Sequence, residues 1–184
     1  MTAIGDHERE RRRRFEAEAL PHLDAAYRLA RWLARRPGDA DDVVQDAMLR
    51  AWRGFDGRHG TAVRPWLLAI VRNCFLSHAA RQARDNDRFA GGDFEVEQHV
   101  PTAAADDPLA ASIRSEQAGT LAAALAALPE DFRTVLVLRE IEDLSYREIA
   151  HVLETPIGTV MSRLARAREA LRRSWRADPR SEPA

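Results

Sequence analysis

The chain has 184 residues, 45% of them hydrophobic, and a formal net charge of −1. This length accommodates one domain or two small helical domains. The single cysteine, Cys74, excludes an intramolecular disulfide and a cysteine-cluster metal site. No apolar stretch approaches the length of a membrane-spanning helix, so we expect a cytoplasmic protein without direct membrane insertion.

The charge is unevenly distributed. Residues 1–84 carry 16 arginines and 11 acidic residues, residues 85–112 carry 1 and 7, and residues 113–184 carry 11 and 11. The acidic excess therefore lies in the middle, and the small net charge does not exclude nucleic-acid binding. All 28 basic residues are arginine. Arginine suits bidentate contacts with phosphate and guanine, although a GC-rich genome explains the same bias.

The N-terminal third predicts two helices. Residues 1–13 are highly charged and are expected to fray, whereas apolar spacing from Phe15 to Leu33 predicts a long amphipathic helix ending near Pro37. Asp39 is a candidate N-cap for the next helix. Apolar residues from Val43 onwards recur every three or four positions in this helix, so they are expected to face the core. Its outer face is expected to present Asp42, Gln45, Asp46, Leu49 and Arg50. Asp46 and Arg50 also suit a local ion pair four residues apart.

Another helix is predicted after a loop at residues 54–60. Its apolar face includes Trp66, Ile70 and Cys74, which favours packing over base stacking for the tryptophan. Basic and amide groups lie mostly off that face, as expected for a surface that follows a nucleic-acid backbone. These residues are Arg72, Asn73, Ser77, Arg81 and Arg84.

The helical pattern disappears over residues 85–112, where glycine, proline, alanine and acidic residues predict a linker. A solvated tether without a further role is the simpler interpretation of this segment. Helical spacing resumes from Ile113 to Leu128, ends before Pro129, and restarts at Phe132 towards Glu142. These two helices are expected to support the helices at the C-terminal end of the chain.

Residues 144–173 predict a helix-turn-helix. Ser145 and Glu148 form a capping box that starts a helix at Tyr146, and Thr155 is a candidate N-cap for a second helix with Pro156 at its first position. One side of the second helix is apolar. The opposite side carries Thr159, Ser162, Arg166 and Arg173, with Arg163 at its edge. We term Thr159, Ser162, Arg163 and Arg166 the recognition face. These residues are candidates for base contacts, and Arg168, Arg172, Arg173 and Arg176 for phosphate contacts. Alternatively, the arginines only complement the helix dipole and maintain solubility.

The stretches SYREIA and PIGTVMSRLARAREALRR resemble the fourth domain of bacterial sigma factors of the extracytoplasmic function class. DADDVVQDAMLRAWR is similar to the part of sigma domain two that docks on RNA polymerase, and RPWLLAIVRNCFLSHAARQAR to the part that opens promoter DNA. The resemblance implies an all-α fold with domain two at 14–84, the linker at 85–112 and domain four at 113–176.

The resemblance also implies roles for individual residues. The recognition face would read the minus-thirty-five element. Asn73 and Ser77 would hold a displaced minus-ten nucleotide, with Arg72, Arg81 and Arg84 at phosphates, and Asp42, Gln45, Asp46, Leu49 and Arg50 would bind core RNA polymerase. An anti-sigma factor is the expected regulator. Met161 departs from the arginine of some relatives and cannot make a bidentate guanine contact.

No site for chemistry is apparent in the sequence. The six histidines lack metal-ligand spacing and there is no glycine-rich phosphate loop, so we expect no enzyme activity, cofactor or metal. Two other functions remain open. A stand-alone helix-turn-helix repressor would bind duplex DNA unaided, usually as a dimer. A sigma mimic would bind a regulator and never DNA, although Arg163 and Arg166 are still present.

Overall fold

The secondary structure is helical throughout the described residues, as expected. The computed structural model describes residues 3–34, 37–58, 62–88, 119 and 121–177. The N-terminal half contains α1 (Ala3–Glu18), η1 (Leu20–His22), α2 (Leu23–Leu33), α3 (Pro37–Gly54), η2 (Phe55–Gly57) and α4 (Val63–Arg88). The C-terminal half contains a short helix at 121–126, α6 (Glu130–Leu136), the π-helical turn η3 (Val137–Ile141), α7 (Tyr146–Leu153) and α8 (Ile157–Ala177). The predicted linker lies mostly outside the described residues.

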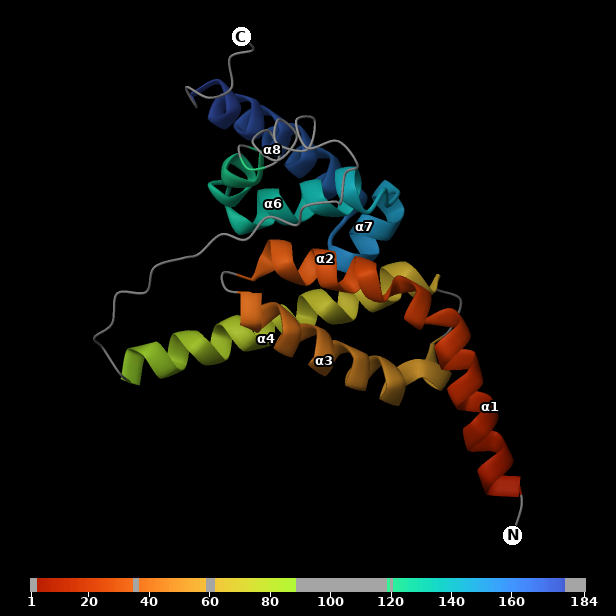
Figure 1. Ribbon diagram of the computed structural model, residues 1–184. Helices are drawn as coiled ribbons and strands as arrows, with labels where there is room; N and C mark the ends of the chain where they lie inside the picture. The colour runs from red at the N-terminus through yellow and green to blue at the C-terminus, as the bar shows by residue number, and fades with distance from the viewer. Residues whose placement is uncertain (1–2, 35–36, 59–61, 89–118, 120, 178–184) are drawn as a thin grey trace, which may run out of the picture.

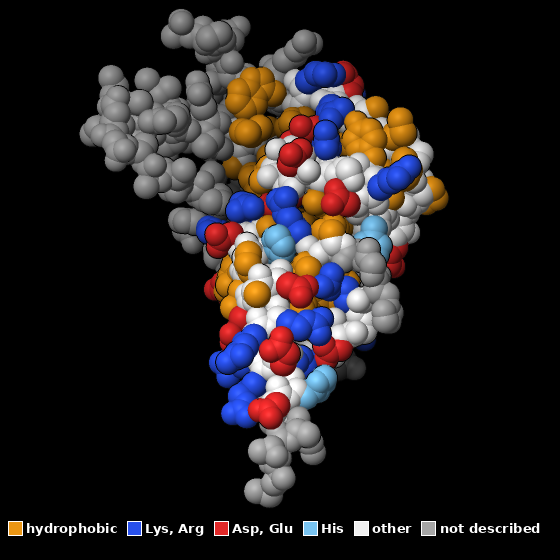
Figure 2. Space-filling view, turned by 90° about the vertical axis from the view of Figure 1, so that its right-hand side faces the viewer, with side chains coloured by type: hydrophobic (Ala, Val, Ile, Leu, Met, Phe, Trp, Pro, Cys, Tyr) orange, Lys and Arg blue, Asp and Glu red, His pale blue; other side chains and the backbone are white. Residues whose placement is uncertain are grey.

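The first predicted helix is wrong in two respects. The chain is helical from Ala3, where fraying was expected, and the helix is interrupted between α1 and α2. Ion pairs along the first helix, such as Arg12 to Glu16 at 2.8 Å, support its charged turns. Figure 2 shows charges of both signs interleaved there, at the bottom of the view. The interruption lies at Pro21, which has no N–H to donate to the preceding turn.

The next helix, α3, begins at Pro37, two residues before the predicted cap at Asp39. Proline is compatible with a first helical turn because the N–H it lacks has no intrahelical partner there. Asp39 instead accepts a hydrogen bond from Gln82 of α4, Nε2 to Oδ1, at 3.1 Å. A residue expected to cap its own helix therefore ties two helices together.

The core of the N-terminal half lies among α2, α3 and α4, which pack pairwise. Four aromatic rings close its α1 end. Phe15 lies edge-on to Trp52 at 5.2 Å and to Phe55 at 5.3 Å, and Phe55 is 6.3 Å from Trp66. Trp66 thus packs against this cluster, as expected, and Cys74 is fully buried.

The two halves are packed against one another. In Figure 1, α6, α7 and α8 lie over α2 and α4, and α1 projects away with the N-terminus. The contacts run from α7 to α4 and from α2 to α6. Buried apolar residues form one continuous cluster from Phe15 in α1 to Ala167 in α8. None of the described helices is long and apolar enough to cross a membrane.

Candidate nucleic-acid interface

The first helix of the helix-turn-helix starts as predicted. The backbone N–H of Glu148 donates to Ser145 Oγ at 3.3 Å, and the Ser145 N–H donates to Glu148 Oε2 at 2.8 Å. Hydrogen bonding of its carboxyl to the Ser145 side chain and to the Ser145 backbone N–H lowers the pKa of Glu148 below its ordinary value. Two otherwise unpaired amides are thereby satisfied, which fixes the start of α7.

The turn between α7 and α8 differs from the prediction. Thr155 does not cap α8, since its hydroxyl is buried without a hydrogen-bond partner in the described structure. Instead, the carbonyl of Pro156 accepts the first hydrogen bonds of α8, from the N–H groups of Thr159 and Val160. Glu154 ends α7 in the left-handed conformation, with φ 52°, where glycine is usual. Three residues, 154–156, separate α7 from α8, so the connection between the two helices is short.

The two sides of α8 differ as predicted. Val160, Leu164 and Ala167 are buried in the core. On the recognition face, Ser162 and Arg166 are exposed and Thr159 is half-buried. Arg166 Nε donates to the backbone oxygen of Ser162, 3.3 Å away. The side chains with hydrogen-bonding groups therefore face solvent.

Arg163 is a partly enclosed member of the recognition face. Its side chain is 19% exposed, and its Nη2 lies 3.2 Å from Oδ2 of Asp131 in α6. A base contact by this guanidinium would need the Asp131 pair to break or to share the arginine. Arg163 therefore has a structural use that the sequence pattern did not reveal.

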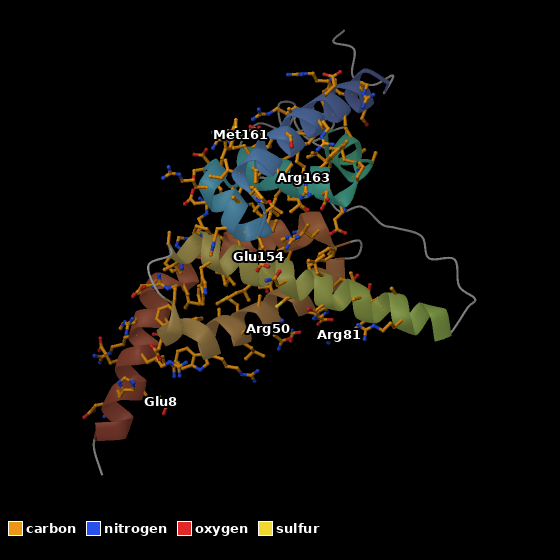
Figure 3. All side chains as sticks on the ribbon, turned by 180° about the vertical axis from the view of Figure 1, so that it is seen from behind. Glu8, Arg50, Arg81, Glu154, Met161 and Arg163 are labelled. Atoms are coloured by element: carbon orange, nitrogen blue, oxygen red, sulfur yellow. The ribbon has the colours of Figure 1, made fainter. Side chains whose placement is uncertain are left out.

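Two apolar side chains near the start of α8 lie on the surface, and one of them, Ile157, was expected to be packed. Met161 is 53% exposed and Ile157, expected on the packed side, is 40% exposed. They lie four residues apart and so share a face of the helix. Figure 3 shows Met161 on the C-terminal half. The start of α8 thus offers apolar as well as polar groups, and the four-residue spacing was the available signal.

Two arginines expected at phosphates have acidic partners. Arg168 donates to Oε1 of Glu140 through Nε at 3.1 Å and Nη2 at 2.7 Å, and this hydrogen bonding raises the pKa of Arg168. Arg172 lies 3.4 Å from Glu169. Both arginines are partly or fully exposed, so a phosphate could replace either carboxylate as the partner.

The predicted minus-ten residues all lie on α4, and we term Arg72, Asn73, Ser77, Arg81 and Arg84 the α4 row. Asn73 and Ser77 are half-buried, whereas Arg81 and Arg84 are exposed. Ser77 Oγ donates to the backbone oxygen of Asn73 at 2.8 Å. The Asn73 amide donates to Glu154 Oε1 of the C-terminal half at 3.4 Å. One end of the row is therefore in contact with the helix-turn-helix.

The predicted polymerase-binding residues, termed the α3 face, form an exposed strip on that helix. Asp42, Gln45, Leu49 and Arg50 are exposed, Leu49 to 48%. Asp46 is half-buried, and its carboxylate lies 2.8 Å from His78 and 3.8 Å from Arg81, both on α4. The hydrogen bond to His78 lowers the pKa of Asp46. Asp46 thus joins the α3 face to the α4 row, and the charge of Arg50 acts on the same carboxylate.

The predicted groups occupy separate places on the molecule. Figure 3 shows Arg50 and Arg81 on the N-terminal half, Met161 and Arg163 on the C-terminal half, and Glu154 where the halves meet. No group of three or more potential metal-binding side chains occurs in the described part of the chain. The described residues thus present several separate charged surfaces.

Two family descriptions match this chain. Residues 20–85 match "Sigma-70 region 2", which contains the α3 face and the α4 row. Residues 118–171 match "Sigma-70, region 4", which contains the helix-turn-helix. These ranges agree with the two halves of the fold.

Characterised relatives and solved structures agree. The chain is 37% identical over 143 residues to the RNA polymerase sigma-H factor of Pseudomonas aeruginosa, covering 72% of this chain and 71% of the relative. It is 36% identical over 140 residues to the ECF RNA polymerase sigma-E factor of Escherichia coli, and the match covers 73% of this chain and 72% of the relative.

Two solved complexes have a similar fold. The sigma factor RpoE of Bartonella quintana, solved with the anti-sigma factor NepR, has a TM-score of 0.73 at 28% identity and covers 89% of this chain and 98% of its own. CnrH, solved with the cytosolic domain of CnrY, has a TM-score of 0.63 at 28% identity, with coverages of 91% and 90%. The chain therefore belongs to the extracytoplasmic function family of RNA polymerase sigma factors.

Proposed function

We propose that this chain directs core RNA polymerase to promoters through two separate DNA contacts, one in each half. The observation that carries this proposal is the solvent-facing recognition face on α8, present in the same chain as the amide and arginine groups of the α4 row. A helix-turn-helix reads duplex DNA, whereas amide and guanidinium groups suit a single strand and its phosphates.

The recognition face is proposed to read the minus-thirty-five element. Arg166 is exposed and long enough for a bidentate contact with guanine, and Ser162 and Thr159 offer hydroxyl groups to base edges. Arg163 is proposed to take part after exchanging its Asp131 partner. Met161 adds an apolar group of the kind that contacts the thymine methyl.

The α4 row is proposed to bind the minus-ten element. Asn73 and Ser77 would hydrogen-bond a displaced base, and Arg72, Arg81 and Arg84 would follow the phosphates. Binding the opened strand shifts the melting equilibrium by the difference in affinity between open and closed DNA. No catalytic group is required, so we propose that the chain contributes binding and the polymerase contributes synthesis.

The α3 face is proposed to dock on core RNA polymerase. A strip that combines acidic groups, an arginine and an exposed leucine suits a partner with basic and apolar surface. We further propose control by an anti-sigma factor, supported by the two similar structures that were solved as complexes. The site of action is proposed to be the cytoplasm, where promoter DNA and polymerase meet.

Promoter binding with and without polymerase tests this function. The free chain is expected to bind a promoter fragment weakly, and the same chain with core polymerase is expected to bind tightly and with sequence preference. Tight binding by the free chain as a dimer would indicate a repressor. Binding neither to polymerase nor to DNA would indicate a sigma mimic.

A further inference from the structure

Glu142 is a buried carboxylate, and its hydrogen-bond donors among the described side chains come from the other half of the chain. It follows η3 in the C-terminal half, and its side chain is 0% exposed. Arg28 of α2 donates to both carboxylate oxygens, Nε to Oε1 at 2.8 Å and Nη2 to Oε2 at 3.0 Å. Arg64 of α4 donates to Oε2 through Nη2 at 2.6 Å. One acidic residue thus joins three helical segments across the boundary between the halves.

This cluster differs from the other ion pairs of the C-terminal half. Glu140 with Arg168 and Asp131 with Arg163 pair residues within that half, and both acids are more than half exposed. A carboxylate without solvent or a partner is strongly unfavourable, whereas two guanidinium groups in hydrogen-bonding geometry compensate its loss of hydration. Glu142 can therefore stay both buried and charged only while Arg28 and Arg64 remain in place.

A second contact joins the halves at the helix-turn-helix. Glu154 adopts a left-handed backbone conformation that costs a residue with a side chain about 1 kcal/mol or more. Its carboxylate accepts the hydrogen bond from Asn73 in the α4 row. Figure 3 shows Glu154 at this boundary. While α7 lies against α4, one N–H of the Asn73 amide is engaged by Glu154, so a nucleotide that binds there has to displace this contact.

The packed arrangement is also too small for two simultaneous DNA contacts. Elements centred about 25 base pairs apart are separated by about 85 Å of duplex at 3.4 Å per pair. A compact chain of this length has a radius of gyration of about 16 Å. The recognition face and the α4 row therefore cannot contact both elements unless the halves separate.

We propose that Glu142 is a latch that docks in the arginine pair of region 2 and holds the free sigma factor closed, with part of the α4 row covered by α7. Charged groups suit a contact that has to separate, because the Glu142 carboxylate and both guanidinium groups regain hydration when the halves move apart. Opening is coupled to binding of DNA and polymerase, and the closed fraction lowers the apparent affinity for both. The predicted effect of the latch on DNA binding rests on the proposed function of the α4 row, whereas its effect on the packing of the two halves does not.

The latch is tested with three full-length variants. Glu142→Gln removes the charge from the C-terminal side, and Arg28→Gln with Arg64→Gln removes it from the N-terminal side. Glu140→Gln is the matched control, since Glu140 lies two residues away but pairs within its own half. Small-angle scattering gives the radius of gyration, and circular dichroism gives the helix content.

Both latch variants are expected to keep wild-type helix content and to have a larger radius of gyration. The radius should remain well below the roughly 46 Å of an unfolded chain of this length. Their affinity for a single-stranded minus-ten oligonucleotide should rise at least about tenfold, as expected when a minor open state becomes the main one. Glu140→Gln should match wild type.

An unchanged radius in either folded latch variant would overturn the proposal. If Glu142→Gln lost helix content, the double arginine variant alone would decide, because those side chains are partly exposed and lie in the other half. A larger radius without any DNA or polymerase binding would support the latch and contradict the proposed function instead.

Discussion

The recognition face and the α4 row differ in how far the rest of the chain occupies them. Apart from Arg163, the side-chain hydrogen bonds of the recognition face to described residues stay within α8, such as Arg166 to the Ser162 carbonyl. The α4 row contacts two other elements, through Asn73 with Glu154 and Arg81 with Asp46. Both surfaces carry similar residue types, so their difference lies in their surroundings.

This difference matches the two forms of DNA that the surfaces are proposed to bind. Duplex DNA is always available, and a helix whose reading side chains already face solvent binds it without rearrangement. A separated strand exists only after polymerase has engaged the promoter. Covering part of the α4 row until then would reduce its binding to other single-stranded nucleic acids. Binding of the promoter strand would then depend on separation of the two halves.

The greatest change in stability should separate the two sides of α8. Leu164→Ala removes a fully buried side chain and should lower the free energy of unfolding by about 2–5 kcal/mol. Met161→Ala removes an exposed side chain from the same helix and should change it by less than about 0.5 kcal/mol. Urea denaturation measures both. Equal losses would mean that α8 has no free side.

The next effect concerns the recognition face itself. Arg166→Ala should weaken binding of the holoenzyme to the upstream element by about 1–3 kcal/mol, since a base or phosphate contact is lost. Arg9→Ala is the control, because Arg9 is exposed on α1 and pairs only with Asp6 among the contacts described. Fluorescence anisotropy with labelled duplex reports the affinity. Equal affinity in the two variants would remove Arg166 from the interface.

A change on the α3 face tests whether docking depends on the same acid that contacts the α4 row. Asp46→Arg should weaken association with core polymerase by on the order of tenfold or more, because it reverses one charge of a complementary surface. Asp6→Arg, at an exposed position of α1, makes the same charge change elsewhere. Titration of labelled chain with polymerase, without DNA, measures the association. Retained affinity would indicate a different docking surface.

A smaller effect distinguishes capping from reading within the helix-turn-helix. Ser145→Ala breaks the capping box and should lower the free energy of unfolding by about 1 kcal/mol. Ser162→Ala should have almost no effect, because that hydroxyl donates only to the Thr159 carbonyl of its own helix. Thermal or urea denaturation compares the two, and a larger loss at Ser162 would reverse their roles.

The effect of Ser145→Ala should also depend on pH. Ser145 lowers the pKa of Glu148 below its ordinary value of 4.5, so the stabilisation is complete above pH 4.5 and is lost as pH falls through the lowered pKa. The difference in the free energy of unfolding between wild type and Ser145→Ala should therefore become smaller at acidic pH. A constant difference down to pH 2 would show that the Glu148 charge does not contribute.

Features that depend on near neighbours could be predicted from the amino-acid sequence alone. The capping box of Ser145 and Glu148, the apolar side of α8 and the burial of Cys74 all depend on spacings of three or four residues, which a helix converts directly into faces and ends. The predictions that failed are the caps at Thr155 and Asp39 and the uninterrupted helix across Pro21. Asp39 shows the reason most plainly, because its carboxylate pairs with Gln82 of another helix, 43 positions away.

Which charged groups meet was settled by tertiary packing. Glu142 with Arg28 is separated by 114 positions and Asn73 with Glu154 by 81, and no periodic pattern links residues so far apart. In the sequence, Glu142 is one of several acids at a helix end. Packing of the two halves buries the Glu142 carboxylate and places two guanidinium groups at its oxygens. The energy of a buried charge depends on all the groups around it, so this role could be seen only in the tertiary structure.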